Sequence, residues 1–343
     1  MSQTPNLPHW KVFEELREWF LANRRPLPWR ENPTPYRVWI SEVMLQQTQV
    51  KTVIPYFHRW MEVFPTVHAL AEAPLEQVIK LWEGLGYYSR ARNLHEAAKM
   101  VVAEHGGELP ADPVKLSKIK GLGPYTIGAI LNFAFHQRAP AVDGNVSRVL
   151  ARFFGGKEVQ IDQILPKREP WVISEALIEL GALICHREPA CQSCPLQQEC
   201  EANRLGMQKE LPRKKKRAKA TLLYRTVGVI RCGESYLLKK GEKGKIMADL
   251  FEFPFVEAKV EPEHAKEKLE KLLKLSLKYV GSLSCQHHTF TRYRAHLYPY
   301  LFEAEEKSEN HLWKTIQELS PLPFSSGHRK ILKQLLIHEN ITH

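Results

Sequence analysis

Four cysteines lie within sixteen residues, and this cluster limits the possible folds more than any other feature of the chain. Their spacing is Cys-x5-Cys-x2-Cys-x5-Cys, at Cys185, Cys191, Cys194 and Cys200. A disulfide framework spreads its cysteines over separate elements, so one short loop of four thiols indicates a metal or cluster site. Zinc ribbons usually pair two Cys-x2-Cys knuckles across a longer loop. The compact run favours a 4Fe–4S cluster, with zinc or unligated thiols as alternatives.

The first 200 residues have mostly the apolar spacing of helices, interrupted by glycine and proline. The clearest helical stretches are 11–22, 36–49, 77–82, 89–105, 125–136, 145–154 and 171–185. The sequence therefore predicts a mainly α region over residues 1–203.

The pattern changes after the cysteine loop. A basic stretch without apolar period follows at 204–220 and is typical of an exposed linker. Beyond it, short β-like runs alternate with two helical stretches. The runs are 222–230, 236–238, 279–283 and 293–302, and the helices 262–275 and 327–338. We expect a smaller α+β domain over residues 221–343.

The charge of the chain favours a polyanionic partner. Lys+Arg 49 against Asp+Glu 38 leaves a net charge of +11, which suits nucleic acid. No apolar run approaches the length of a membrane span, and the start resembles no secretory signal. We expect a monomer in a bacterial cytoplasm, associated with the nucleoid and not with a membrane.

A glycine-rich segment at 116–130, LSKIKGLGPYTIGAI, predicts a tight turn between two short helices. Gly121 and Gly123 would permit positive φ angles there. The N–H groups of such a turn form a natural phosphate site, and Lys118 and Lys120 add charge. The alternative is a helix–turn–helix connection without a ligand. The net charge of the chain favours DNA-backbone binding.

Glu42 lies in an otherwise apolar helical stretch. A carboxyl group forced into apolar surroundings keeps its proton, because burial penalises the charged form. That property is what a general acid needs at neutral pH. The alternatives are an exposed Glu42, or one paired with Arg30 or Arg37.

Asp143 precedes a helical run and is followed by glycine, so an ordinary N-cap explains it on its own. An aspartate at a helix N-terminus is also suited to stay ionised and to face a developing cation. One buried acid and one exposed carboxylate together are the pattern of glycosidic-bond cleavage.

These segments resemble the MutY-type adenine DNA glycosylases of the helix–hairpin–helix base-excision superfamily. The resemblance rests on residues 38–50, 85–94, the glycine hairpin, 142–150 and the cysteine loop, and covers most of 10–202. It implies an enzyme that hydrolyses the N-glycosidic bond of adenine mispaired with 8-oxoguanine or guanine in duplex DNA. It also implies a 4Fe–4S cluster in the cysteine loop, although the first spacer is one residue shorter than the family's six.

The resemblance assigns roles to single residues. Glu42 would protonate adenine N7, Asp143 would stabilise the oxocarbenium sugar, and Asn145 would hold the site. Other residues would bind the flipped adenine or wedge into the duplex. The adenine pocket would comprise Trp29, Arg30 and Glu175, and the wedges would be Gln47 and Tyr87.

Tyr125 occupies the hairpin position at which the glycosylase/lyases of the superfamily carry a lysine. A phenol forms no Schiff base, so we expect a monofunctional glycosylase.

The last third resembles the family's Nudix-like C-terminal domain, which reads 8-oxoguanine. Residues 250–254, LFEFP, match its LWEFP signature, and no Nudix metal motif follows. Residues 288–292 stand at the lesion-sensing loop, which usually reads Phe-Ser-His. Phe290 and the hydroxyl of Thr291 fit this pattern, whereas Arg292 departs from it.

Two alternatives remain at this point. One is another glycosylase or glycosylase/lyase of the superfamily, acting on oxidised pyrimidines or thymine mismatches. Glu42 argues against it, because the lyases need no acid on that helix. The other is a non-enzymatic iron–sulfur DNA-binding regulator.

Overall fold

The structure is a computed structural model that describes residues 10–213, 220–242, 244 and 246–339. It divides into two compact units, each formed from two stretches of chain. Unit 1 comprises Met1–Glu72 and Asn93–Lys216, and unit 2 comprises Ala73–Arg92 and Arg217–His343. Most basic residues of the expected linker, at 214–219, lie outside the described residues. Within the described ranges, no helix has the length and apolar character needed to cross a membrane.

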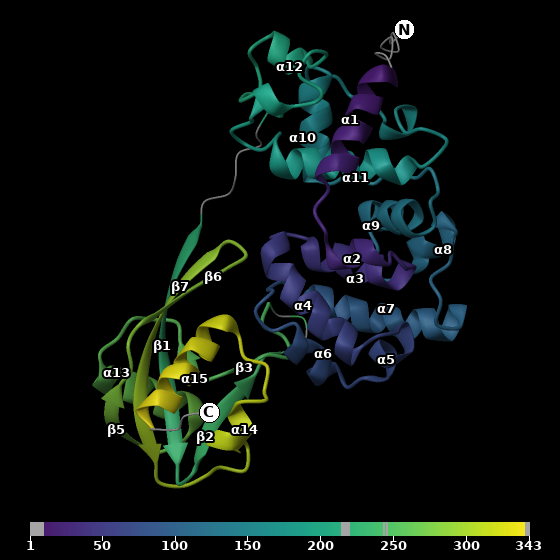
Figure 1. Ribbon diagram of the computed structural model, residues 1–343. Helices are drawn as coiled ribbons and strands as arrows, with labels where there is room; N and C mark the ends of the chain where they lie inside the picture. Colours follow the sequence, from purple (N-terminus) through teal and green to yellow (C-terminus); the bar gives the residue numbers. More distant parts are fainter. Residues whose placement is uncertain (1–9, 214–219, 243, 245, 340–343) are drawn as a thin grey trace. The chain divides into compact units, whose positions relative to one another are not determined.

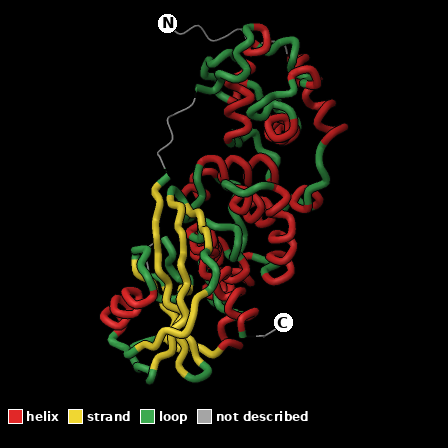
Figure 2. The backbone as a smooth tube through the Cα atoms, turned by 90° about the vertical axis from the view of Figure 1, so that its left-hand side faces the viewer, coloured by secondary structure: helices red, strands yellow, loops and turns green. Residues whose placement is uncertain are grey.

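Unit 1 is helical, as its apolar spacing predicts (Figures 1 and 2). Its first half contains α1 (Trp10–Asn23), α2 (Pro28–Glu31), α3 (Pro35–Leu45), α4 (Val50–Val63), α5 (Val67–Glu72) and most of α7 (Ser89–His105). Its second half contains α8 (Pro113–Lys118), α9 (Pro124–Ala129), the π-helix η1 (Ile130–Ala134), α10 (Gly144–Phe153), α11 (Pro170–Leu183) and α12 (Glu201–Arg204). Unit 1 also contains two 3-10 turns, η2 (Ile161–Gln163) and η3 (Cys191–Ser193).

One core joins α1, α10 and α11, with Leu16, Val149 and Leu177 buried in it. Two glycines let the backbone approach closely around it. A Cβ on Gly181 of α11 would lie 2.6 Å from the Cβ of Asn145, and one on Gly128 of α9 would lie 1.8 Å from the carbonyl oxygen of Pro140. The sequence thus brings α9 and α11 against the segment that carries Asp143.

Two predicted helices of unit 1 have different limits in the structure. The helix expected to reach residue 49 ends at Leu45, because Gln46 leaves the helical region and Gln47 adopts a φ of 61°. The helix expected over 125–136 begins at Pro124 and becomes π-helical from Ile130. Helices α4 and α5 were not expected at all.

Unit 2 contains an eight-stranded mixed sheet with helices on both faces, which confirms the smaller α+β domain. Its strands are β1 (Thr221–Cys232), β2 (Ser235–Lys240), β3 (Phe251–Glu252), β4 (Phe255–Val256), β5 (Leu277–Ser282), β6 (Gln286–Phe290), β7 (Tyr293–Ala304) and β8 (Leu312–Thr315). Its helices are α6 (Leu75–Leu81), α13 (Pro262–Leu273), α14 (Ile316–Leu319) and α15 (Ser326–His338). The short strands β3, β4, β6 and β8 were not expected.

The order β3-β2-β1-β7-β5 is built around a long parallel pair, β1 and β7. Alternate residues of β1 point to opposite faces of the sheet. Val229 packs with Ile331 of α15, whereas Ile230 packs with Leu269 of α13. Strands β6 and β7 form a hairpin with Phe290 opposite Tyr293 next to its turn.

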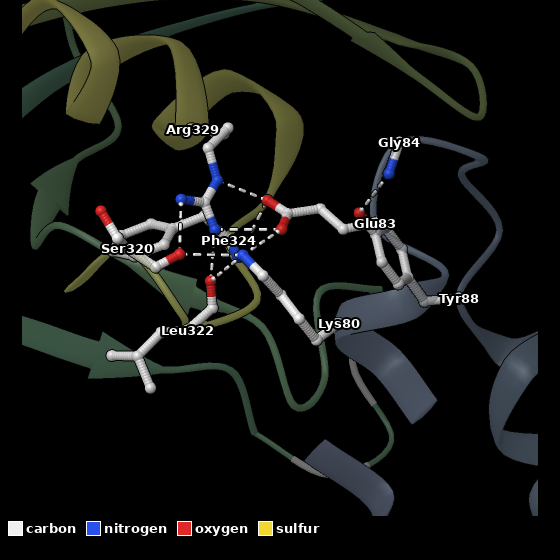
Figure 3. Close-up of polar contacts among 8 residues, drawn as sticks. All are labelled: Lys80, Glu83, Gly84, Tyr88, Ser320, Leu322, Phe324 and Arg329. Atoms are coloured by element: carbon white, nitrogen blue, oxygen red, sulfur yellow. Dashed lines mark hydrogen bonds and ion pairs between the residues drawn. The ribbon is translucent and has the colours of Figure 1, made fainter. Parts of the chain in front are cut away.

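The segment 73–92 is fastened to the rest of unit 2 by charged groups (Figure 3). Arg329 of α15 contacts both carboxylate oxygens of Glu83, at 2.6 and 3.0 Å. Lys80 donates to the carbonyl oxygens of Ser320 and Leu322 at 2.9 and 3.1 Å. The side chains of Glu83 and Arg329 are only 13% and 19% exposed. We call this group the Glu83–Arg329 anchor.

Candidate active site

Glu42 lies on α3 and is 7% exposed. The hydroxyl of Tyr125 on α9 donates a hydrogen bond to its Oε2 at 2.5 Å. Burial raises the pKa of Glu42 to about 7, although the Tyr125 hydrogen bond lowers it. The charges of Glu175 and Asp143 raise it further. Glu42 is thus neither exposed nor paired with Arg37, whose guanidinium donates to the carbonyl oxygen of Pro28.

A cavity of about 630 Å³ brings the predicted catalytic and adenine-binding residues together. This volume falls within the range of small-molecule sites. Its walls include every residue for which the sequence predicted a catalytic or adenine-binding role, together with one wedge. These are Trp29, Arg30, Glu42, Gln47, Tyr125, Asp143, Asn145 and Glu175. All of them belong to unit 1.

Asp143 is the N-cap of α10 and is half-buried. Its Oδ1 accepts from the backbone N–H of Val146 at 2.7 Å, and its Oδ2 accepts from the side-chain amide of Asn145 at 2.8 Å. Arg148 donates to the other end of that amide, at 2.8 Å. Asp143 therefore does cap α10. The capping hydrogen bond holds Asp143 at the cavity wall and fixes the direction of its carboxylate.

Two carboxylates of α11, Glu175 and Glu179, line the cavity and face Arg30. The Nε of Arg30 lies 2.5 Å from Oε2 of Glu175, and its Nη2 lies 3.1 Å from Glu179. Burial raises the pKa of Glu175, and the charge of Arg30 lowers it. Burial also opposes ionisation of Glu179, but hydrogen bonds from Arg25 and the charge of Arg30 outweigh it and lower the pKa of Glu179.

Sequence reasoning missed Glu179, Arg25 and Arg148, which orient the predicted residues. Glu179 stands four residues after Glu175 on an apolar helix, and that spacing places both carboxylates on one face. This signal was available. Arg148 follows Asn145 by three residues on α10, so helical spacing was an available signal for this pair too.

In the glycine hairpin, Gly121 has a φ of 82° as expected. The expectation for Gly123 was wrong. It has a φ of −87° and is the N-cap of α9, a conformation open to other residues. Lys118 and Lys120 are both exposed, and Lys120 forms an ion pair with Glu96.

Three of the four residues with predicted wedge or lesion-sensing roles have unusual backbones. Gln47, Tyr87 and Thr291 adopt φ angles of 61°, 48° and 46°. Positive φ is uncommon outside glycine, and such conformations concentrate at functional sites. Tyr87 is also 47% exposed, although its ring is apolar.

A second cavity, of about 710 Å³, lies wholly within unit 2. Tyr87, Phe290 and Thr291 line it. Phe290 ends β6, and Thr291 and Arg292 form the turn to β7. The guanidinium of Arg292 lies over the ring of Tyr293 and donates to its hydroxyl at 3.2 Å.

The four clustered cysteines are half-buried, and their thiols interact electrostatically. Among the described residues, no three of these sulfur atoms lie within 4.8 Å of one another. A tetrahedral zinc site would hold them about 3.8 Å apart, given Zn–S bonds of about 2.3 Å. Four thiol groups in one short loop are a donor set that suits an iron–sulfur cluster as well as zinc. Arg152 donates to Cys185 Sγ at 3.3 Å, and backbone N–H groups donate to Cys194 and Cys200.

Two family models match separate parts of the chain. Residues 40–171 match the family described as HhH-GPD superfamily base excision DNA repair protein. Residues 226–334 match the NUDIX domain.

Individual proteins give longer matches. The chain is 31% identical over 348 residues to the adenine DNA glycosylase of Buchnera aphidicola subsp. Acyrthosiphon pisum, covering 94% of this chain and 97% of that protein. It is 39% identical to the enzyme of the same name from Buchnera aphidicola subsp. Baizongia pistaciae, where the match spans only 58% of the relative. Among solved structures, a non-covalent endonuclease III–DNA complex has a TM-score of 0.51 at 27% identity, covering 58% of this chain and 96% of that one.

Proposed function

We propose, from the premise that this chain belongs to the adenine DNA glycosylase family, that it removes adenine paired with 8-oxoguanine or guanine in duplex DNA. The predicted family, the two-part fold and the class of reaction, hydrolysis of adenine's N-glycosidic bond in DNA, are confirmed. The mispair and the steps below are our proposal.

The observation that carries the mechanism is the shared cavity of Glu42 and Asp143. With a pKa of about 7, Glu42 is protonated in a large fraction of molecules at neutral pH. We infer that it transfers this proton to N7 of the flipped adenine. Protonation lets the base accept the electron pair of the glycosidic bond and leave as neutral adenine.

Cleavage of that bond leaves positive charge on C1′ and the ring oxygen of the sugar. The carboxylate of Asp143, held by Asn145 and the N–H of Val146, would stabilise this charge. Water then adds to C1′ and releases a proton, giving an abasic site. The ionised Glu42 left by the first step would accept this proton and return to its protonated form.

The adenine pocket would use Arg30 and Glu175 to contact the edge of the base and Trp29 as a wall. Glu179 supports this arrangement, because its carboxylate holds Nη2 of Arg30 while Nε faces Glu175. Flipping an adenine costs a few kcal/mol, and these contacts would offset part of that cost.

The enzyme would be monofunctional. Tyr125 brings a hydroxyl and no amine to Glu42, and burial raises its own pKa well above the usual value. It would keep its proton, act as a hydrogen-bond donor to Glu42 and not serve as a nucleophile.

Duplex recognition would combine the backbone and the opposite base. The hairpin of Gly121, Gly123, Lys118 and Lys120 would bind phosphates. Gln47 would wedge into the duplex. Tyr87 would do the same from unit 2, where Phe290 and Thr291 line the same cavity and would read 8-oxoguanine.

Cys185, Cys191, Cys194 and Cys200 would hold the 4Fe–4S cluster, which would fasten a loop that has little core of its own. The domain limits expected from the sequence, 1–203, 204–220 and 221–343, stay part of this proposal. So do a monomeric state and a site of action in the cytoplasm at the nucleoid, where duplex DNA is the substrate.

The test is to incubate the protein with duplexes carrying adenine opposite 8-oxoguanine, guanine, cytosine or thymine, and to measure free adenine. We expect release from the first two only, and its loss in Glu42→Gln while duplex binding is kept. Glu62→Gln, an exposed glutamate of unit 1, is the control and should behave like the wild type. Equal release from all four duplexes would contradict the proposed selectivity. Unchanged release by Glu42→Gln would contradict the mechanism.

A further inference from the structure

A second group of metal-ligating side chains lies in unit 2, far along the sequence from the cysteine loop. The thiol of Cys285 and one ring nitrogen each of His287 and His296 lie within 4.8 Å of one another. Neither the active-site mechanism nor the proposed lesion reading uses them.

The sheet explains why these three side chains meet. Cys285 and His287 are two residues apart, so an extended chain places both on one face. His296 is the Cα partner of His287 across the β6–β7 ladder, and their ring centroids are 4.4 Å apart. The ligands thus come from both strands of one hairpin.

The surroundings hold the imidazoles and leave their nitrogens available. Tyr224 of β1 packs its ring 5.4 Å from that of His296, opposite which it stands in the parallel ladder. Within the described ranges, no hydrogen bond to a ring nitrogen of His287 or His296 is found. Imidazole nitrogens that no protein group occupies are available as ligands for a metal ion.

We propose that Cys285, His287 and His296 bind one zinc-like divalent transition-metal ion, which bridges β6 and β7. A thiolate and two imidazoles suit Zn²⁺, and a water molecule would take the fourth position. Tetrahedral bonds would bring the nitrogens about 3.4 Å and each nitrogen and the sulfur about 3.6 Å apart. Rotation of the Cys285 and His287 side chains can bring the three ligand atoms to these distances, because both residues are exposed. Binding releases the thiol proton of Cys285 to solvent.

The position of the site determines which part of the hairpin a bound ion would stabilise. His287 lies three residues before Phe290 on β6, and the turn with Thr291 follows. A metal bridge below that turn would stiffen the hairpin that lines the second cavity. This consequence rests on the proposed function, whereas metal binding itself does not.

The test uses the full chain with its cysteine loop intact. Wild type, Cys285→Ser, His287→Gln and the control His264→Gln, an exposed histidine of α13, are incubated with excess Zn²⁺ or Co²⁺ and separated from free metal. Bound metal is measured by mass spectrometry, and the visible bands of tetrahedral Co²⁺ as difference spectra. Comparison between variants removes any contribution of the cysteine loop, which all four share.

We expect one additional equivalent in wild type and control, and at least tenfold weaker uptake in Cys285→Ser and His287→Gln. Circular dichroism and adenine release without added metal should match the wild type and so establish that the variants fold. Zinc should also slow amide exchange over residues 286–297 in the wild type alone. Equal uptake by all four proteins, or no uptake beyond that of the two variants, would overturn the proposal. If the wild type takes up the metal but releases adenine equally from all four duplexes, the proposed function is contradicted and metal binding is not.

Discussion

Removal of the Tyr125 hydroxyl gives the sharpest test of the proposed acid. Tyr125→Phe deletes a 2.5 Å hydrogen bond that stabilises the ionised form of Glu42 and lowers its pKa. The variant should therefore raise the pKa of Glu42 above its value of about 7. A hydrogen bond to a charged group is worth about 1.5–3 kcal/mol. At about 1.4 kcal/mol per tenfold change, the pKa should rise by roughly one to two pH units.

The sign of the effect on rate follows from the role of Glu42. A general acid works only when protonated, so excision is supported below the pKa and lost as the pH rises through it. In Tyr125→Phe, the alkaline limb of the single-turnover rate should move to higher pH. At pH 8, the protonated fraction of Glu42 should grow from about a tenth to half or more.

The assay is single-turnover adenine release from an adenine:8-oxoguanine duplex, measured across the pH range. Tyr56→Phe, a tyrosine of α4 whose ring lies under Arg59, is the matched control and should keep the wild-type profile. An alkaline limb that stays in place or moves to lower pH in Tyr125→Phe would refute the assignment of Glu42 as the acid.

Three further outcomes are expected. Glu83→Gln breaks the Glu83–Arg329 anchor and should displace Tyr87. It should lower the preference for 8-oxoguanine over guanine at least several-fold while retaining adenine release. An unchanged preference would show that the anchor does not position Tyr87. Gly128→Ala should lower the free energy of unfolding by about 3 kcal/mol or more in denaturant titrations, because its Cβ would meet the backbone at Pro140. Equal stability would contradict that close approach. Duplex binding should weaken steeply with salt through counterion release, and a flat salt dependence would exclude phosphate contacts as a main source of affinity.

Much of the active site could be predicted because its chemistry depends on local sequence. Glu42 stands among apolar neighbours, and Asp143 stands where a helix begins, so their burial and capping follow from a few adjacent residues. The partners that set their properties come from elsewhere in the chain. Tyr125 is 83 residues from Glu42, and no local pattern predicts a hydrogen bond at that separation.

The fold was predicted less well wherever long-range contacts override local preference. The end of α3 at Leu45 follows from the positive φ of Gln47, a conformation that glutamine rarely favours on its own. Strands β3 and β4 are two residues long, too short for any alternation to appear in the sequence. The helical stretches within residues 73–92 have the same apolar spacing as their neighbours. Nothing in that spacing indicated that these residues belong to unit 2.

Because residues 73–92 belong to unit 2, deletion of the C-terminal part of unit 2 affects more than the deleted residues. A chain ending before β1 would lose Arg329 and with it the groups that hold Lys80 and Glu83. Tyr87 would then remain in the polypeptide without the surface on which its turn is built. If these residues act as proposed, poorer selectivity in such a fragment would combine two defects, loss of the proposed reader of the opposite base and displacement of Tyr87, the proposed wedge. Substitutions at single positions of the intact protein separate them, and deletion does not.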